Sequence, residues 1–336
     1  LFYLQARLAQ RERPHLNTSV HKIALLYFAA AACGMMAVMS KENTASLPGI
    51  IILIEILCFR PFFKHKKKLL WISLMSVLWV IFVLFVVGFF DQTGSGESLL
   101  EDVSDLMRET KKVSTWQYLC TQFNVVTRYI RLLFLPAGQN LDYKYPFKKG
   151  FLDDLTPLAF LFLAAVAAIG VMLRKKHPAV TFGIAWFFIA LSVESSIIPI
   201  SDAMFEHRVY LGMFGFALII PYVVSIWVRN ISTFLIICLC LVLALGTATF
   251  ARNSVWRDDA RLWQDVISKA PHNDRAHYNL GLAYSGQKKA ADAIKFYRKA
   301  IDLNPRFSQA YYNCANAFFD TGRLEEAIPF YRKAIE

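Results

Sequence analysis

The sequence lacks the short motifs that mark the common soluble enzyme and metal-binding classes. Its six cysteines form no CxxC pair, and four of them lie inside apolar runs, so we expect neither a disulfide framework nor a zinc site. It has no glycine-rich phosphate loop, no Ser-His-Asp order and no spacing typical of metal ligands. We therefore predict no metal site and no resident cofactor, although a need for a divalent ion stays open.

Charge is also scarce relative to apolar residues. Charged residues make up 18% of the 336 residues, hydrophobic residues make up 56%, and the mean hydropathy is +0.39. This composition indicates a multi-pass membrane protein. The net charge is +12, and the positive residues gather in short runs between apolar segments. Because that distribution is typical of membrane topology signals, we predict no nucleic-acid partner.

Apolar segments alternate with polar turns over residues 1–250, which we predict to be the C-terminal part of a transmembrane helix bundle. The chain starts without Met inside an apolar segment and stops within a repeat, so we expect both ends to be cut. The long loop 91–155 contains a helix at 116–135 that we predict to lie on the membrane surface. The predicted spans are residues 23–39, 47–59, 69–90, 155–173, 179–195, 209–228 and 231–250.

Four short turns between the spans are basic, and the turn 60–68 has five Lys or Arg in nine residues. If these turns face the cytoplasm, all the spans alternate without conflict. The loop 91–155, the turn 195–210 and everything after Phe250 then lie outside the cytoplasm. We expect a bacterial inner membrane with a periplasmic C-terminal part, and the ER membrane is the eukaryotic equivalent.

A repeat of 34 residues follows the last span. Pro271 and Pro305 are 34 residues apart, and the run FYRKAI occurs in both copies. This is the tetratricopeptide (TPR) pattern, and it predicts repeats at 274–307 and 308–336, the second incomplete. Residues 251–273 are predicted to be a connecting helix or a degenerate repeat. The whole chain is thus predicted to be all-α, with a helix bundle followed by an extracytoplasmic TPR solenoid.

The turn between the spans 179–195 and 209–228 carries an unusual set of polar side chains. Glu206, His207, Arg208 and Tyr210 lie within five residues at the end of a predicted span. Charge next to hydrocarbon is unfavourable unless it is paired or used, and a guanidinium can grip two phosphate oxygens. We predict that these residues bind substrate. The alternative is a helix end with a snorkelling Arg and its Glu partner.

Two further outer stretches carry candidate residues. Lys41 and Glu42 end the span 23–39, where Lys41 could meet an anionic headgroup and Glu42 could pair with Arg208. Asp142 and Tyr145, with Tyr143 between them, could line a sugar site, because aromatic rings stack on pyranose faces and carboxylates accept from hydroxyls. The alternatives are an interfacial ion pair and interfacial Tyr anchors.

Glu55 lies within the short span 47–59. A carboxylate inside a span is a functional candidate, which raises the possibility of a transporter. It could instead snorkel, or pair with a basic residue of the following turn. The largely apolar spans argue against a transport path.

Three motifs follow one another in an order that resembles a known arrangement. SKEN follows an apolar run, LDYKYP follows the helix 116–135, and EHRVYLG comes before WRDD and the TPRs. They resemble the transmembrane TPR-containing O-mannosyltransferase family and its bacterial relatives, members of the GT-C glycosyltransferase superfamily. In that family the third motif reads approximately Glu-Arg, whereas here His207 stands between Glu206 and Arg208.

The resemblance implies a GT-C-like bundle and transfer of a sugar from a polyprenyl-phosphate donor to an acceptor protein outside the cytoplasm. It implies that Arg208, with Lys41, holds the lipid phosphate, and that the catalytic acid lies upstream of Leu1, so the catalytic residue is unknown. The expected partners are membrane lipid, the lipid-linked sugar and an acceptor bound by the TPRs. The alternative function is a non-catalytic, membrane-anchored TPR scaffold for envelope protein complexes.

Overall fold

The computed structural model describes residues 2–12, 23, 25–30, 33, 46–58, 113–192, 195, 199–200 and 202–336. The secondary structure of these residues is helical and includes no strand, which confirms the predicted all-α class. The predicted span 69–90, most of 23–39, and Lys41 and Glu42 lie outside the described residues.

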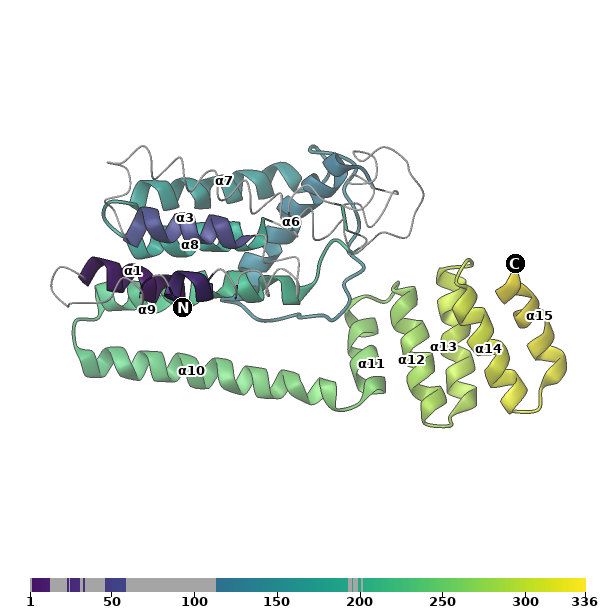
Figure 1. Ribbon diagram of the computed structural model, residues 1–336. Coiled ribbons are helices and arrows are strands. Elements are labelled where there is room, and N and C mark those ends of the chain that lie inside the picture. Colours follow the sequence, from purple (N-terminus) through teal and green to yellow (C-terminus); the bar gives the residue numbers. More distant parts are fainter. Residues whose placement is uncertain are drawn as a thin grey trace. The chain divides into compact units, whose positions relative to one another are not determined.

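Figure 1 shows the helices. Their bounds are α1 (Phe2–Glu12), α3 (Leu47–Cys58), α6 (Thr115–Phe134), α7 (Thr156–Leu173), α8 (Pro178–Leu191), η3 (Glu206–Arg208), α9 (Val209–Trp227), α10 (Ile231–Asn253), η4 (Ser254–Arg257), α11 (Asp259–Lys269), α12 (Asp274–Gly286), α13 (Ala290–Leu303), α14 (Ser308–Asp320) and α15 (Leu324–Ile335).

The chain forms two compact units. The first unit comprises Leu1–Val126, Lys148–Ser201 and Arg208–Ile220. The second unit comprises Thr127–Phe147, Asp202–His207 and Pro221–Glu336. Each unit is described by its own contacts below.

The first unit is built from closely packed apolar helices. Helix α8 packs against both α3 and α7. It also approaches α9 through two glycines, since a Cβ on Gly183 would lie 2.5 Å from the carbonyl oxygen of Gly215. Small residues at such crossings let helix backbones touch, which is how helices associate where the hydrophobic effect offers little driving force.

Glu55 on α3 is buried in the first unit, with 1% of its surface exposed. Its carboxylate accepts hydrogen bonds from Arg7 on α1, at 2.5 Å from Nε and 2.8 Å from Nη2, and from the Tyr3 hydroxyl at 2.7 Å. One alternative was a pair with a basic residue of the following turn, and the partner is instead an arginine 48 residues earlier. The bidentate ion pair reduces the free-energy cost of burying both charges among apolar helices.

Three candidate membrane spans are found among the described residues, at Thr156–Leu173, Glu206–Trp227 and Ile231–Arg257. Helix α8 is apolar but shorter. Helix α10 has no buried residue, and its leucines are exposed along its whole length. An apolar helix of this length that covers no protein core suits contact with lipid.

Helix α6 matches the amphipathic helix predicted at 116–135. One face of it is buried and includes Tyr118, Gln122, Val125 and Tyr129, which recur at helical spacing. Within the first unit, Asn124 donates to the Thr156 hydroxyl at 2.8 Å. Protein packing therefore covers one side of this helix, while its placement on a membrane surface stays a prediction.

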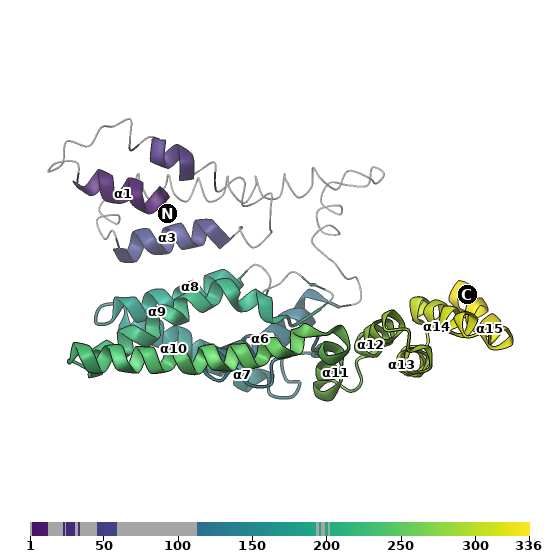
Figure 2. The ribbon, with the colours of Figure 1, turned by 90° about the horizontal axis from the view of Figure 1, so that it is seen from below.

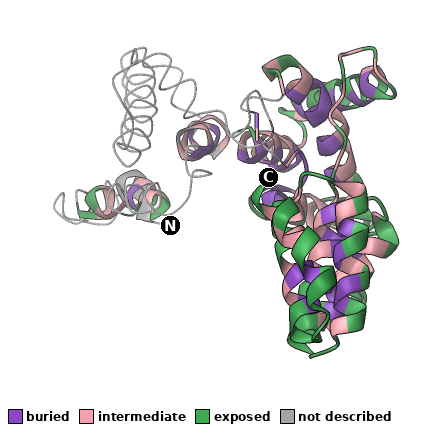
Figure 3. Ribbon diagram, turned by 90° about the vertical axis from the view of Figure 1, so that its right-hand side faces the viewer, coloured by how far each residue is buried: buried purple, intermediate pink, exposed green. Residues whose placement is uncertain are grey.

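The second unit contains α10, α11 and the repeat helices. Helix α12 packs against α13 and α14 packs against α15, and the four helices follow one another in sequence order (Figure 2). Buried residues lie where these helices meet, and exposed residues cover their outer sides (Figure 3). The core centres on Tyr297 and Phe318, with small residues between them. Gly281 is required at the α12–α13 crossing, because a Cβ there would lie 2.6 Å from the Tyr297 ring.

Candidate functional site

Helix α6 leads into the site loop, residues 135–147. Pro136 cannot continue the helix, and Gly138 takes a left-handed φ of +71°, which glycine adopts without strain. The loop then turns through Asn140 and Asp142, both more than nine-tenths buried. The buried polar groups of these two residues need partners, and other residues of the second unit provide them.

Tyr129 on α6 holds the second segment of the site, Asp202–His207, in place. Its hydroxyl donates to the Phe205 carbonyl at 2.7 Å and accepts from the Phe205 amide at 3.1 Å. Tyr129 is fully buried, and Ala203 and Met204 beside Phe205 are 2% exposed. The start of the 3-10 helix η3 is therefore held at a defined place against the end of α6.

Glu206 at the start of η3 binds the site loop. Its Oε1 accepts from the Tyr143 hydroxyl at 2.5 Å and from the Asn140 amide at 2.7 Å. Burial, together with the hydrogen bond to Glu206, raises the pKa of Tyr143 above its ordinary value. The phenol is thus protonated at neutral pH and acts as a donor. The Arg128 guanidinium lies over the Tyr143 ring, 4.9 Å from its centroid, in a cation–π contact.

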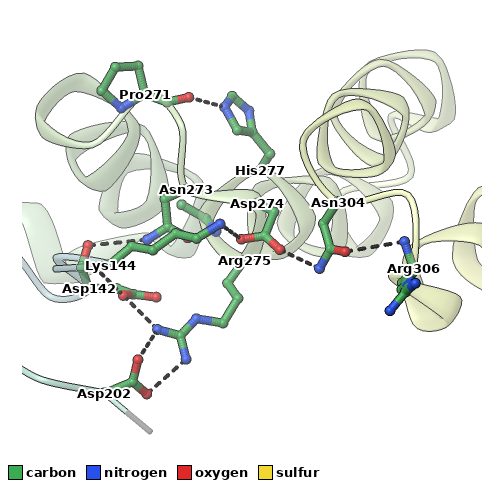
Figure 4. Close-up of polar contacts among 11 residues, drawn as sticks. Asp142, Lys144, Asp202, Pro271, Asn273, Asp274, Arg275, His277, Asn304 and Arg306 are labelled. Atoms are coloured by element: carbon green, nitrogen blue, oxygen red, sulfur yellow. Dashed lines mark hydrogen bonds and ion pairs between the residues drawn. The ribbon is translucent and has the colours of Figure 1, made fainter. Parts of the chain in front are cut away.

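A second polar cluster joins the site loop to the first repeat (Figure 4). Arg275 on α12 donates to Asp142 at 2.9 Å and, through both terminal nitrogens, to Asp202 at 2.6 and 2.9 Å. The hydrogen bonds to Asp202 raise the pKa of Arg275 against the effect of burial, so the cation is fixed. Arg275 thereby holds the loop and the Asp202–His207 segment to one helix of the array.

Asp274 and Asn273 complete this cluster. Asn273, 1% exposed, donates to the Asp142 carbonyl at 3.3 Å. Asp274 accepts from Lys144 and, at 2.7 Å, from Asn304 at the end of α13. Burial opposes ionisation of Asp274, but these hydrogen bonds and the Lys144 charge outweigh it and lower its pKa. Lys144 has a φ of +41°, an uncommon conformation that its contacts support.

The structure brings three of the predicted site residues into one neighbourhood. Asp142 and Glu206 meet through Asn140, whose amide reaches Glu206 and whose side chain reaches the Asp142 carbonyl at 3.1 Å. His207 is exposed and stacks on Phe205, with ring centroids 5.1 Å apart. Asp142 is engaged with Arg275, so its role toward a sugar stays a prediction.

The other predicted residues that the structure describes differ in burial. Arg208 ends η3 and is 5% exposed, whereas Tyr210 on α9 is 78% exposed. Tyr145 is partly buried in the site loop. Lys41 and Glu42 are outside the described residues, so the predicted pocket shared by Lys41 and Arg208 stays a prediction.

Sequence reasoning missed Asn140, Asp202 and Arg275. Arg275 is 133 residues from Asp142 and 73 from Asp202, so no spacing in the chain links them. The available signal was weaker: an aspartate four residues before Glu206, and an arginine at the start of the first repeat. Among the described residues, no group of three His, Cys, Asp or Glu side chains is placed to hold a metal ion.

These features define a class of protein: an all-helical chain with helices able to cross a membrane and a C-terminal TPR array. The tetratricopeptide repeat family matches residues 274–307 and 308–336, which confirms the predicted repeats. One curated relative is "Protein O-mannosyl-transferase F38B6.6" from Caenorhabditis elegans, 26% identical over 176 residues. The match covers 51% of this chain and 25% of the relative, so the chain spans about a quarter of that protein's length.

Solved structures give a weaker likeness. "Crystal structure of MamA" is 16% identical with a TM-score of 0.24, covering 53% of this chain and 90% of that one. "MamA 41-end from Desulfovibrio magneticus RS-1" is 16% identical with a TM-score of 0.23, covering 64% and 93%. Scores this low do not establish a shared overall fold.

Proposed function

We propose that this chain is part of a GT-C-type membrane glycosyltransferase that transfers a sugar from a polyprenyl-phosphate donor to a hydroxyl of an acceptor protein outside the cytoplasm. The relative named as an O-mannosyl-transferase supports this class and favours mannose as the sugar. The candidate spans and the TPR array suit an enzyme that meets a lipid-linked donor and a protein acceptor.

The observation that carries the proposal is the turn Glu206–Arg208 at the start of a candidate span. Arg208 is 95% buried there, and Glu206 is held by Tyr143 and Asn140 rather than pointing freely into water. Polar groups fixed at the end of a span are unfavourable unless they are used. A solvated helix end would not require two loop donors for its carboxylate.

The transfer gives Arg208 a defined task. A bond forms between the acceptor oxygen and the anomeric carbon while the bond from that carbon to the phosphate oxygen breaks. The acceptor proton passes to a base that the described residues do not assign, and the lipid phosphate leaves with increased negative charge. A fixed guanidinium near that phosphate stabilises the transition state more than the ground state.

The test replaces Arg208 with Lys and with Ala in the full-length protein purified in detergent, with polyprenyl-phosphate mannose as donor. Loss of one such positive group lowers the transfer rate by about 10²–10³-fold in Arg208→Ala, and Lys restores part of it. The matched control is Arg229→Ala, which alters an exposed arginine in the turn after α9. Unchanged transfer by a folded Arg208→Ala protein rejects the proposal.

The second candidate is a membrane-anchored scaffold, and the exposed aromatic residues of the array favour it. Tyr312 and Phe319 lie on the same face of α14 and are 53% and 58% exposed. In the first proposal this surface presents the acceptor, and in the second it recruits a protein partner without catalysis. Absence of donor binding and transfer in the wild-type protein, with partner binding that depends on Phe319, selects the scaffold.

A further inference from the structure

Two buried polar atoms beside the Tyr143–Glu206 pair have no hydrogen-bond partner among the described residues. They are Oδ1 of Asn140 and Nε of Arg128. Asn140 is 2% exposed, and its backbone N–H and its Nδ2 are both engaged. Buried polar groups in proteins are nearly always paired with protein, water or ligand, so each of these two atoms can take a partner from outside the described residues.

The orientation of the Asn140 amide is fixed by its surroundings. Its Nδ2 donates to the Asp142 carbonyl, which also accepts from Asn273. A flipped amide would set one carbonyl oxygen against another, so the unpaired atom is the oxygen. This atom therefore needs a donor, whereas the Arg128 N–H needs an acceptor.

Glu206 adds a third open position. Both hydrogen bonds to its carboxylate from described residues reach Oε1, and Oε2 receives none from them. Tyr143 connects the three groups: its hydroxyl bonds Glu206 and the Asn140 amide, and its ring lies under Arg128. The cluster thus offers two acceptors and one charged donor around a single phenol.

We infer that this cluster, Arg128, Asn140, Tyr143 and Glu206, binds hydroxyl groups of the donor's sugar ring, not its phosphate. A phosphate has only acceptor oxygens at neutral pH, so it could satisfy Arg128 but would oppose the oxygens of Asn140 and Glu206. A sugar hydroxyl both donates and accepts, and neighbouring hydroxyls of a pyranose satisfy all three positions. This inference rests on the proposed function, in which Arg208 serves the phosphate.

The test compares two probes, polyprenyl-phosphate mannose and the same polyprenyl phosphate without sugar, by their Kd for the purified protein. We expect Asn140→Ala and Arg128→Lys each to raise the Kd of the mannose lipid about tenfold or more and to leave that of the bare lipid phosphate within about twofold. Lys keeps a cation over Tyr143 but lacks the Nε–H. Arg208→Ala should weaken both probes.

The matched control is Arg131→Lys, an exposed arginine three residues further along α6. Thermal unfolding confirms that each variant is folded, and Arg128→Lys carries the test if Asn140→Ala is not. Equal effects on both probes, or none on either, overturn the inference, and the two atoms then serve an ordered water. Wild-type protein that binds neither probe overturns the proposed function, and this inference with it.

Discussion

At the scale of single residues, the site depends on side chains whose partners are distant in the sequence. The partners of Glu206 come from 63 and 66 residues earlier, and the Asp274 side chain bonds Lys144 and Asn304 on either side of it. Each of these carboxylates is partly or fully removed from water. In such surroundings an unpaired charge is unfavourable. Protonation of Asp274 would weaken its ion pair with Lys144 of the site loop.

The lowered pKa of Asp274 predicts acid sensitivity. A carboxyl whose pKa is lower in the folded than in the unfolded state stabilises the fold above its unfolded pKa, near 3.9, and loses that contribution as the pH falls through the folded value. We therefore expect the thermal unfolding temperature of the array in the wild type to decrease as the pH is lowered below about 4.

Asp274→Asn should be less stable at pH 7, by about 1–2 kcal/mol, and its unfolding temperature should decrease less than that of the wild type as the pH is lowered below about 4. Calorimetry of the purified protein measures both quantities. The matched control, Asp302→Asn, alters an exposed aspartate of the same repeat. A pH profile for Asp274→Asn that follows that of the wild type would contradict this account.

At the scale of helices, two contacts of α12 decide how the array begins. On one side Arg275 reaches the aspartates of the site loop and of the Asp202–His207 segment. On the other side Gly281 lets α13 approach. The first contact concerns the site, and the second concerns the stability of the repeat, so their variants should have separable effects.

Arg275→Gln should loosen the site loop while the repeats stay folded. The variant loses three hydrogen bonds between charged groups. Because the Arg275 side chain is 41% exposed, water weakens these bonds, and we expect local stability to decrease by about 1–3 kcal/mol. Hydrogen exchange of amides in residues 139–144 and 202–206 should accelerate. Arg306→Gln, at an exposed arginine, is the control, and equal exchange in both variants contradicts the prediction.

Gly281→Ala should destabilise the first repeat, although alanine is the better helix former. The added methyl would lie 2.6 Å from the Tyr297 ring, and such overpacking costs about 1–3 kcal/mol. The control is Gly286→Ala, since a Cβ there has nothing within 4 Å and should be neutral or stabilising. Thermal unfolding that ranks the two variants in the opposite order refutes the close-packing argument.

At the scale of the whole molecule, the consecutive candidate spans Glu206–Trp227 and Ile231–Arg257 set the topology. Two successive crossings return the chain to the side from which it started. We therefore expect the Glu206–Arg208 turn and the TPR array to share one side of the membrane and the Arg229 turn to face the cytoplasm.

Cysteine labelling tests this arrangement in sealed membranes, in a background without native cysteines. Lys288→Cys in the array and Arg229→Cys in the turn should react with a membrane-impermeant maleimide from opposite sides. Both positions are exposed, so accessibility within the protein does not limit labelling. Labelling of both positions from the same side would contradict the topology with two crossings.

The sequence by itself determined the elements that follow from periodicity and composition. The helices α7, α9 and α10 lie where apolar runs predicted spans, and the repeats lie where the period of 34 residues placed them, because a helix needs only its own hydrogen bonds and an apolar face. The polar residues of the turn before α9 were also visible as a dense set. Their partners were not.

Only the tertiary structure decided those pairings. It joined Glu55 to Arg7, Glu206 to Tyr143 and Asn140, and Asp142 to Arg275. Each partner is one of many polar residues in a chain with 37 Lys and Arg, and neither composition nor spacing distinguishes it. Which residue becomes the partner depends on which charge is buried where helices and loops meet, because a buried charge must be neutralised. Those meeting points exist only once the chain has folded.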